Sequence, residues 1–149
     1  VQEIRFREIN RQEVQVSNLH LSDFAYETAL TQEHFLQWVT DNNRIAGFLR
    51  LSLPKWNEIN ARDINDDLAV SEGDAMIREV HVYGQAAHLG KDDASAQHHG
   101  LGRKLIEQAE EIARAEGYVK LNVISSVGTR EYYRKQGFVK DGLYQSIVL

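Results

Sequence analysis

The chain has 149 residues, of which 42% are hydrophobic, and a formal net charge of −5 at pH 7. This length and apolar content predict one domain with a single packed core. The sequence contains no cysteine, which excludes disulfides, zinc–thiolate sites and iron–sulfur clusters within it. It has no signal-peptide pattern and no apolar run of about 18 residues, so we expect a cytoplasmic protein with no membrane partner.

The charge is unevenly distributed along the chain. Residues 58–79 carry seven acidic against two basic side chains, whereas residues 114–140 carry six basic against two acidic ones. An acidic domain does not bind nucleic acid through its overall charge. The asymmetry is explained either by two solvated faces or by an anionic ligand near the basic C-terminal third, and composition alone leaves both explanations open.

The first residues are expected to form a tether rather than part of the core. Residues 1–16 alternate only loosely between apolar and polar, and the chain begins with Val1 rather than methionine, which suggests a piece of a longer protein. The domain itself is expected over residues 17–149. Apolar runs predict three strands, at residues 20–29, 34–40 and 45–53. A turn is expected to join the last two as a hairpin.

The rest of the chain is expected to alternate between strands and helices. Residues 55–74 are polar and irregular, and residues 84–96 form a loop that is long for a compact domain. The clearest helix is predicted from Gly102 to Gly117, because apolar side chains recur there at helical spacing. The other expected elements are strands over 75–83, 119–124 and 138–149 and a short helix over 129–137. This order predicts an α+β fold, in αβα layers, with helices flanking a mixed, mostly antiparallel sheet.

A glycine motif lies where the long loop meets the main helix. Gln97-His98-His99-Gly100-Leu101-Gly102 places two glycines at the predicted helix start. Glycine lets the backbone approach a ligand closely, and the first amides of a helix lack partners within it and lie at its positive end. The segment is therefore either a phosphate-binding site or an ordinary loop end. It is neither a Walker A loop nor a complete dinucleotide fingerprint.

Two motifs together resemble the GNAT acetyltransferase superfamily. The Gln-x-x-Gly-x-Gly pattern of residues 97–102 is similar to the diphosphate-binding motif of that superfamily. Tyr132-Tyr133-Arg134-Lys135-Gln136-Gly137-Phe138 resembles the signature at the end of its last helix. The two motifs lie in the expected order, with a strand between them. The resemblance implies the acyl-CoA N-acyltransferase fold and acetyl-CoA as the acyl donor.

Residues 77–84, 97–102 and 124–135 are similar to the acetyltransferase domain of the Elongator catalytic subunit family. Residues 1–11 resemble the end of the linker in that family. The resemblance implies a tRNA uridine(34) acetyltransferase, which uses acetyl-CoA to place carboxymethyl-type groups on a wobble uridine and hydrolyses acetyl-CoA when tRNA binds. The radical S-adenosylmethionine domain of that family, which holds an iron–sulfur cluster, is absent from this sequence.

The resemblance also implies how acetyl-CoA is held. In the superfamily the strand before the phosphate loop splays from its neighbour, and its backbone pairs with the pantetheine arm. Here that stretch would be Glu79, Val80, His81 and Val82. The diphosphate would be held by four consecutive backbone amides: Gly100, Leu101, Gly102 and Arg103. Gln97 would hold the loop entry, and the Arg103 side chain is either an added cation or a solvated residue of the first turn.

Tyr133 matches the general acid of the superfamily. A phenol with a pKa of about 10 can protonate the thiolate of CoA, whose pKa is about 8.5 to 9, without a large mismatch. The alternative is a packed aromatic ring that only hydrogen-bonds the sulfur. Tyr132 is expected to serve core packing.

Glu79 and His81 are candidates for a general base. Their spacing of two residues places them on the same face of a strand. Backbone contacts with the donor are an alternative role for both. His20, His34 and His88 show no constellation with one another, so we expect no metal site.

Only residues 30–33 separate the first two predicted strands, where typical superfamily members have two helices that cover the acceptor. The missing helices favour a large acceptor such as tRNA. A free-standing N-acetyltransferase that acts on a protein lysine or a small amine is the alternative enzyme, and a non-catalytic acyl-CoA-binding module is a third possibility. The loop at residues 84–96 adjoins the phosphate motif and is a candidate gate for the donor site.

Overall fold

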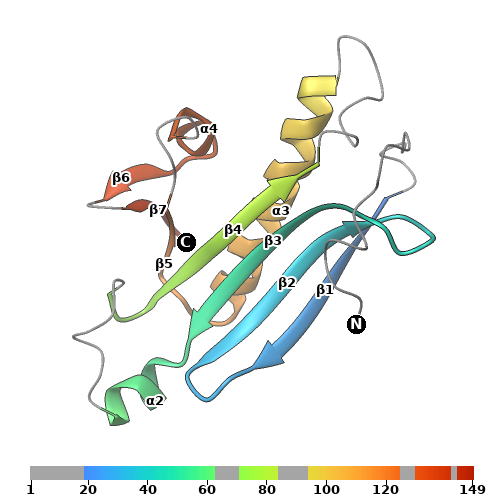
Figure 1. Cartoon of the computed structure of the whole chain (residues 1–149). Helices are drawn as coiled ribbons and strands as arrows, with labels where there is room; N and C mark the ends of the chain where they lie inside the picture. Colours follow the sequence, from blue (N-terminus) through green and yellow to red (C-terminus); the bar gives the residue numbers. More distant parts are fainter. Residues whose placement is uncertain (1–18, 63–70, 84–93, 125–129, 142–143) are drawn as a thin grey trace.

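The computed structural model describes residues 19–62, 71–83, 94–124, 130–141 and 144–149. Seven strands and three helices lie within these residues (Figure 1). Their bounds, in chain order, are β1 His20–Glu27, β2 Thr31–Val39, β3 Ile45–Pro54, α2 Trp56–Ala61, β4 Asp74–Val82, α3 Ala94–Ala115, β5 Lys120–Val123, α4 Arg130–Lys135, β6 Val139–Asp141 and β7 Tyr144–Val148. The predicted tether at residues 1–16 and the loop at residues 84–93 lie outside the described residues.

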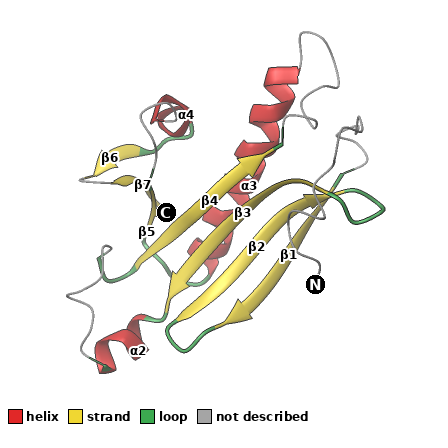
Figure 2. Cartoon of the chain, in the orientation of Figure 1, coloured by secondary structure: helices red, strands yellow, loops and turns green. Residues whose placement is uncertain are grey.

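All seven strands form one mixed sheet in the order β1-β2-β3-β4-β5-β7-β6 (Figure 2). Strands β1 to β4 follow one another as antiparallel neighbours, and β5, β7 and β6 continue the sheet in antiparallel pairs. Only β4 and β5 run parallel, and α3 is the crossover between them. The α+β class and the mostly antiparallel sheet predicted from the sequence are confirmed.

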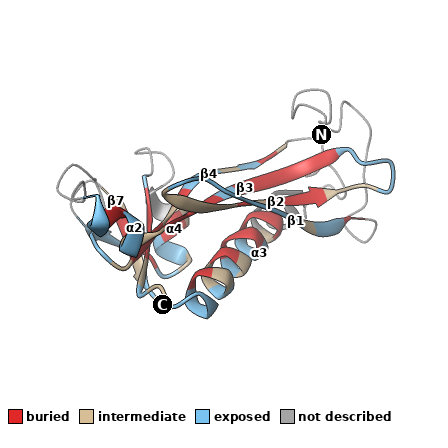
Figure 3. Cartoon of the chain, turned by 90° about the horizontal axis from the view of Figure 1, so that it is seen from below, coloured by how far each residue is buried: buried red, intermediate tan, exposed pale blue. Residues whose placement is uncertain are grey.

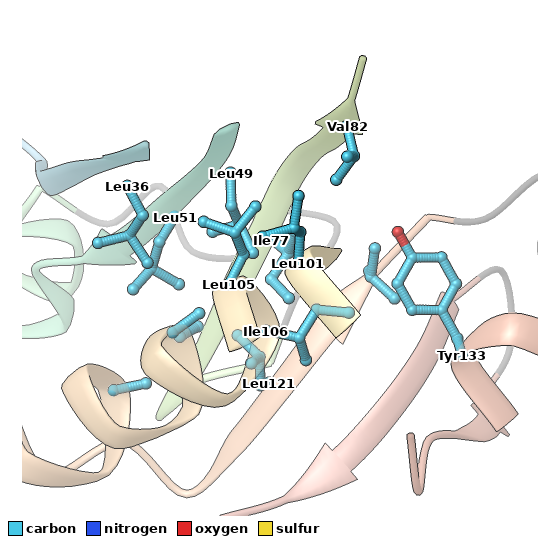
Figure 4. Packing of buried hydrophobic residues seen from close by; sticks show 14 of the residues in the cluster. Leu36, Leu49, Leu51, Ile77, Val82, Leu101, Leu105, Ile106, Leu121 and Tyr133 are labelled. Atoms are coloured by element: carbon cyan, nitrogen blue, oxygen red, sulfur yellow. The ribbon is translucent and has the colours of Figure 1, made fainter. Parts of the chain in front are cut away.

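The core lies between α3 and one face of the sheet (Figure 3). The buried side chains of α3, among them Leu101, Leu105 and Ile106, recur at helical spacing and meet alternate side chains of β2 to β5 (Figure 4). Each fully buried leucine or isoleucine contributes roughly 1.5 to 3 kcal/mol. The sheet face opposite α3 carries the more exposed side chains, including Phe24 and Tyr26 of β1.

The first two strands are joined directly. A short turn over residues 28–30 links β1 to β2, and the Thr28 hydroxyl oxygen accepts the amide hydrogens of Leu30 and Thr31 at 3.3 and 2.9 Å. No helix separates these two strands, as the sequence predicted. Among the described residues, α3 covers one face of the sheet and no helix is inserted between β1 and β2.

Two predictions about helices were wrong. Residues 55–74 were expected to be irregular, but α2 occupies Trp56–Ala61 and buries Ile59. The main helix was expected to begin at Gly102, but α3 begins at Ala94. Alanine and glutamine residues ahead of the glycines are good helix formers, and they extend the helix through Gly100 and Gly102.

Candidate acetyl-CoA site

The strands β4 and β5 are paired for only part of their length. Asp74 to Ile77 pair with Lys120 to Val123, where β5 ends, whereas β4 continues to Val82. Beyond Ile77, β4 keeps its antiparallel partner β3 but has no ladder to β5 in the described residues. One edge of β4 from Arg78 to Val82 therefore has no strand partner among the described residues.

A β-bulge at Arg78, in the pairing of β4 with β3, lies directly after the last residue of β4 that pairs with β5. Glu79 pairs with Arg50 and Ile77 pairs with Leu51, so Arg78 is the additional residue on β4. A one-residue bulge reverses which alternate side chains face the core. Ile77 is buried before the bulge and Val82 is buried after it. No sequence pattern indicated this reversal.

The bulge exposes both candidate bases on one face of β4. Glu79 and His81 are exposed, whereas Val80 is half-buried and Val82 is buried. The Glu79 carboxylate lies 3.6 Å from the Arg50 guanidinium, and both side chains are about half exposed, so this pair contributes little stability. The predicted common face of Glu79 and His81 is confirmed.

An aromatic group surrounds His81. Its imidazole lies edge-on to the Tyr83 ring at 4.5 Å between centroids and 6.0 Å from the Phe48 ring. Phe48 in turn lies 5.3 Å from Phe35 on β2. These contacts hold the imidazole at the end of β4 that lies beyond the last pairing with β5.

Buried polar groups join the strands at their paired end. The Asn122 amide nitrogen donates to the Asp74 carboxylate at 3.0 Å, and the Ser146 hydroxyl donates to the Asn122 side-chain oxygen. Lys120 completes the group, with its ammonium nitrogen 3.6 Å from Asp74 and 2.7 Å from Asp141. The pKa of the Asp141 carboxyl is lowered by its hydrogen bond with Lys120. Because these side chains come from β4, β5, β6 and β7, they fix the end of the sheet from which the two parallel strands diverge.

Tyr133 lies across the divergence from β4. Its side chain is only 7% exposed and packs edge-on against Tyr132 and Phe138, at 5.3 and 5.7 Å between ring centroids. The hydroxyl group points away from α4, toward the part of the core that contains Leu101 and Val82 (Figure 4). Burial raises the pKa of Tyr133 further above neutral pH, where the phenol of an exposed tyrosine is already protonated.

Tyr132 packs against the core, as expected, and also contacts the glycine motif. A Cβ at position 102 would collide with the Tyr132 hydroxyl. Burial raises the pKa of Tyr132 to about 12, and repulsion by the Tyr133 phenolate adds to this increase while Arg103 opposes it. α4 therefore rests on α3 at a position that tolerates only glycine without displacement.

The four amides predicted to hold a diphosphate lie inside α3 rather than at its first turn. Since the helix begins at Ala94, residues 100–103 fall in its second and third turns, where amides normally bond to carbonyls of the preceding turn. Gln97 also lies within the helix. The Arg103 side chain is exposed and lies 3.5 Å from Glu107, which favours the solvated role for that side chain.

A residue that sequence reasoning missed also contacts the glycine motif. The Trp38 indole N–H donates a 3.1 Å hydrogen bond to the Leu101 carbonyl, 63 residues later in the chain. No local pattern signals a contact over that distance. Gly47, which pairs with Trp38, was the available clue, because glycine within a strand often marks a close approach.

The described residues contain no group of three or more His, Cys, Asp or Glu side chains placed to hold a metal ion. His34 binds Asp23 and His20 binds Asp41, each through one ring nitrogen. None of the described helices is long and apolar enough to cross a membrane.

Comparison with known proteins explains this arrangement. Residues 4–138 match the model of the acetyltransferase (GNAT) family. This chain belongs to the GNAT family of acetyltransferases. Membership in this family implies acetyl-CoA as the acyl donor.

Among GNAT proteins, this chain is similar to Elongator complex protein 3 of Dictyostelium discoideum, with 36% identity over 97% of this chain and 26% of that protein. It is 37% identical to the tRNA uridine(34) acetyltransferase of Methanocaldococcus jannaschii over 87% of this chain and 23% of that protein. The solved structure of the archaeal Methanocaldococcus infernus Elp3 with an N-terminal deletion superposes with a TM-score of 0.66, 30% identity and coverage of 89% of this chain and 30% of that chain. The chain thus spans about a quarter of the length of the curated relatives it matches.

Proposed function

We propose that this GNAT domain binds acetyl-CoA for an enzyme that modifies the wobble uridine of tRNA. The observation that carries the proposal is the divergence of β4 from β5 after Ile77, with the protonated Tyr133 hydroxyl pointing toward it. An extended thioester placed along the open edge of β4 would bring its sulfur to this hydroxyl.

The pantetheine arm would pair with the β4 backbone from Glu79 to Val82. This edge has amides and carbonyls in extended conformation and no described strand beside it. A flexible amide-bearing arm can satisfy such groups as a short added strand does. Because β3 holds the other edge, β4 needs no rearrangement to accept the arm.

The diphosphate would bind to the amides of Gly100 to Arg103 after the first turns of α3 open. Each glycine weakens a helix by about 1 kcal/mol relative to alanine, so Gly100 and Gly102 make the turns before Leu105 the weakest part of α3. Opening ahead of Gly100 would free these amides at a new helix end, where the dipole favours an anion. No acidic side chain lies in the first turn to oppose it.

The chemistry assigned to this chain is the release of acetyl from sulfur. Attack on the thioester carbonyl by water or another nucleophile breaks the carbon–sulfur bond and leaves a thiolate. Tyr133 would donate its proton to that thiolate and regain one from solvent. Because burial raises the pKa of Tyr133, its phenol holds a proton at neutral pH, as an ordinary tyrosine does, and is a weaker acid than an exposed one. Hydrolysis then yields acetate and CoA.

The acceptor is proposed to be tRNA in the full-length protein. One relative is named for acetyl transfer to tRNA uridine(34), and others are named Elongator complex protein 3. No helix is inserted between β1 and β2 to cover an acceptor, which suits a large acceptor. The curated relatives are longer than this chain. We propose that a radical S-adenosylmethionine domain with an iron–sulfur cluster, outside this chain, transfers the acetyl group to the uridine. We expect this reaction to take place in the cytoplasm.

A second candidate is N-acetyl transfer to a protein lysine or a small amine. It is favoured by Glu79 and His81, which lie exposed on one face and could take a proton from an ammonium group. This reaction needs such a base to deprotonate the ammonium before it attacks, whereas in hydrolysis the attacking water can release its proton to solvent. Acetylation of a lysine peptide by the isolated domain, lost in His81→Gln or Glu79→Gln, would identify this alternative.

The proposal is tested by calorimetric titration with acetyl-CoA and with ADP, which carries the diphosphate without the pantetheine arm. We expect acetyl-CoA to bind and ADP to bind more weakly, because the β4 contacts are missing. Acetyl-CoA hydrolysis by the full-length protein should then rise when tRNA is added. Absence of acetyl-CoA binding by the full-length protein would refute the proposal, and binding without hydrolysis under any condition would indicate a non-catalytic module.

A further inference from the structure

We propose that Trp38 is a positioning residue for the diphosphate of acetyl-CoA, a role that rests on the proposed function. The indole N–H of Trp38 on β2 donates to the carbonyl of Leu101 on α3, and both residues are buried. Leu101 lies between the two glycines of the phosphate motif. The bond therefore joins the sheet to the segment whose amides are proposed to hold the anion.

Because the peptide bond is planar, a contact with the Leu101 carbonyl also affects the Gly102 amide. The carbonyl of Leu101 and the N–H of Gly102 belong to one rigid trans unit and point in opposite directions. A hydrogen bond that fixes the carbonyl therefore also fixes the direction of the Gly102 amide. Gly102 has no side chain to anchor it, so once the preceding turn of α3 opened, the bond from Trp38 would hold the direction of its amide.

The pairing of β2 with β3 is irregular beside Trp38. Trp38 pairs with Gly47 at an irregular point in the β2–β3 ladder, since the next residue, Val39, pairs with Ile45. A Cβ on Gly47 would lie 3.1 Å from the His81 carbonyl oxygen and 3.2 Å from a methyl group of Val82. The bare backbone of Gly47 thus lets β3 approach β4 closely next to the residue that carries the indole.

The contact also decides where an opening of α3 would stop. Leu101 is held by its buried side chain and by Trp38, and Gly102 is covered by the Tyr132 hydroxyl. Gly100 has open space around it. Turns ahead of Gly100 can therefore unwind while the peptide between Leu101 and Gly102 keeps its direction.

The chain contains a matched control for this contact. Its second tryptophan, Trp56, donates an indole hydrogen bond of the same 3.1 Å length to the carbonyl of Asp74, at the opposite end of β4. Trp38→Phe and Trp56→Phe each keep a ring and remove one indole N–H. Both variants should lose similar stability, because they lose the same kind of bond.

The test compares the affinity of both variants and the wild-type chain for acetyl-CoA and for S-acetylpantetheine, which lacks the diphosphate. We expect Trp38→Phe to weaken acetyl-CoA binding about five- to tenfold and Trp56→Phe to change it less than about twofold. S-acetylpantetheine should bind all three proteins equally. In hydrogen exchange, Trp38→Phe should lose protection at residues 101–105.

Equal effects of the two variants, or a loss that Trp38→Phe shows for both ligands, would overturn the role of Trp38 and leave the proposed function standing. If the wild-type full-length protein bound neither ligand, the proposed function itself would be overturned. The wild-type measurement therefore separates the two failures.

Discussion

The hydroxyl of Tyr132 on α4 lies against the backbone of Gly102 on α3, in the space that a side chain at position 102 would need. The contact joins the two sequence motifs by which the family was recognised. It also explains in physical terms why the second glycine of the motif is required even though α3 runs through it without a break.

Gly102→Ala is therefore expected to destabilise the fold by about 1 to 3 kcal/mol, because the new methyl group displaces Tyr132 or α4. Urea denaturation measures the loss. The double variant Gly102→Ala/Tyr132→Phe removes the colliding hydroxyl and leaves the nearest ring carbon at 3.5 Å, an ordinary contact. It should recover most of the stability, and additive losses in the two single variants would contradict the collision.

Gly100→Ala should have the opposite effect on stability. A Cβ at position 100 meets no atom within 4 Å, and alanine favours the helix by about 1 kcal/mol. The free energy of unfolding is expected to rise while acetyl-CoA affinity falls about fivefold, since the first turns of α3 then open less readily. Denaturation and calorimetric titration measure the two quantities. Glu111→Ala, farther along the same helix, should leave affinity unchanged, and tighter binding by Gly100→Ala would contradict the opening of α3.

Tyr133→Phe separates chemistry from packing. The phenylalanine ring keeps the contacts with Tyr132 and Phe138, so stability and acetyl-CoA affinity should change little. Loss of the proton donor is expected to lower the rate of tRNA-stimulated acetyl-CoA hydrolysis by about 10²- to 10⁴-fold. Tyr118→Phe loses a hydroxyl that donates to the Pro54 carbonyl and should hydrolyse at the wild-type rate. An unchanged rate in Tyr133→Phe would assign the hydroxyl no part in proton transfer.

Stability should fall at alkaline pH. The pKa of Tyr132 is about 12 in the folded chain against about 10 for an unfolded tyrosine, and burial also raises the pKa of Tyr133 and Tyr118. The unfolded state therefore releases these protons first, and the free energy of unfolding decreases as the pH rises from about 10 toward 12. Denaturation at pH 8.5, 10 and 11.5 measures the slope. Tyr132→Phe should reduce it, and an equal slope in that variant would contradict the assignment.

The sequence predicted the sheet, the missing helices between β1 and β2 and the two family motifs, because these depend on local periodicity and glycine placement. It did not predict the bulge at Arg78. The bulge changes which alternate side chains of β4 face the core, and this depends on how β3 and β4 pair. The glycines were taken as the start of the main helix, yet favourable residues ahead of them extend α3 to Ala94. The contact of Trp38 with Leu101 is set by tertiary packing that no local pattern encodes. The roles of Tyr133, Gln97 and the β4 backbone remain predictions for the experiments above.

The single parallel pairing in the sheet also sets an order for folding. Strands β1 to β4 are neighbours in the chain, except for the segment that contains α2, and can pair by short-range closure as soon as they are synthesised. The β4–β5 ladder has only four residue pairs and joins positions 46 residues apart, such as Asp74 and Lys120, so it forms only after α3 has docked. We expect β1 to β4 to gain hydrogen-exchange protection first during refolding, and the β4–β5 ladder, which ends where the proposed pantetheine edge of β4 begins, to gain it last.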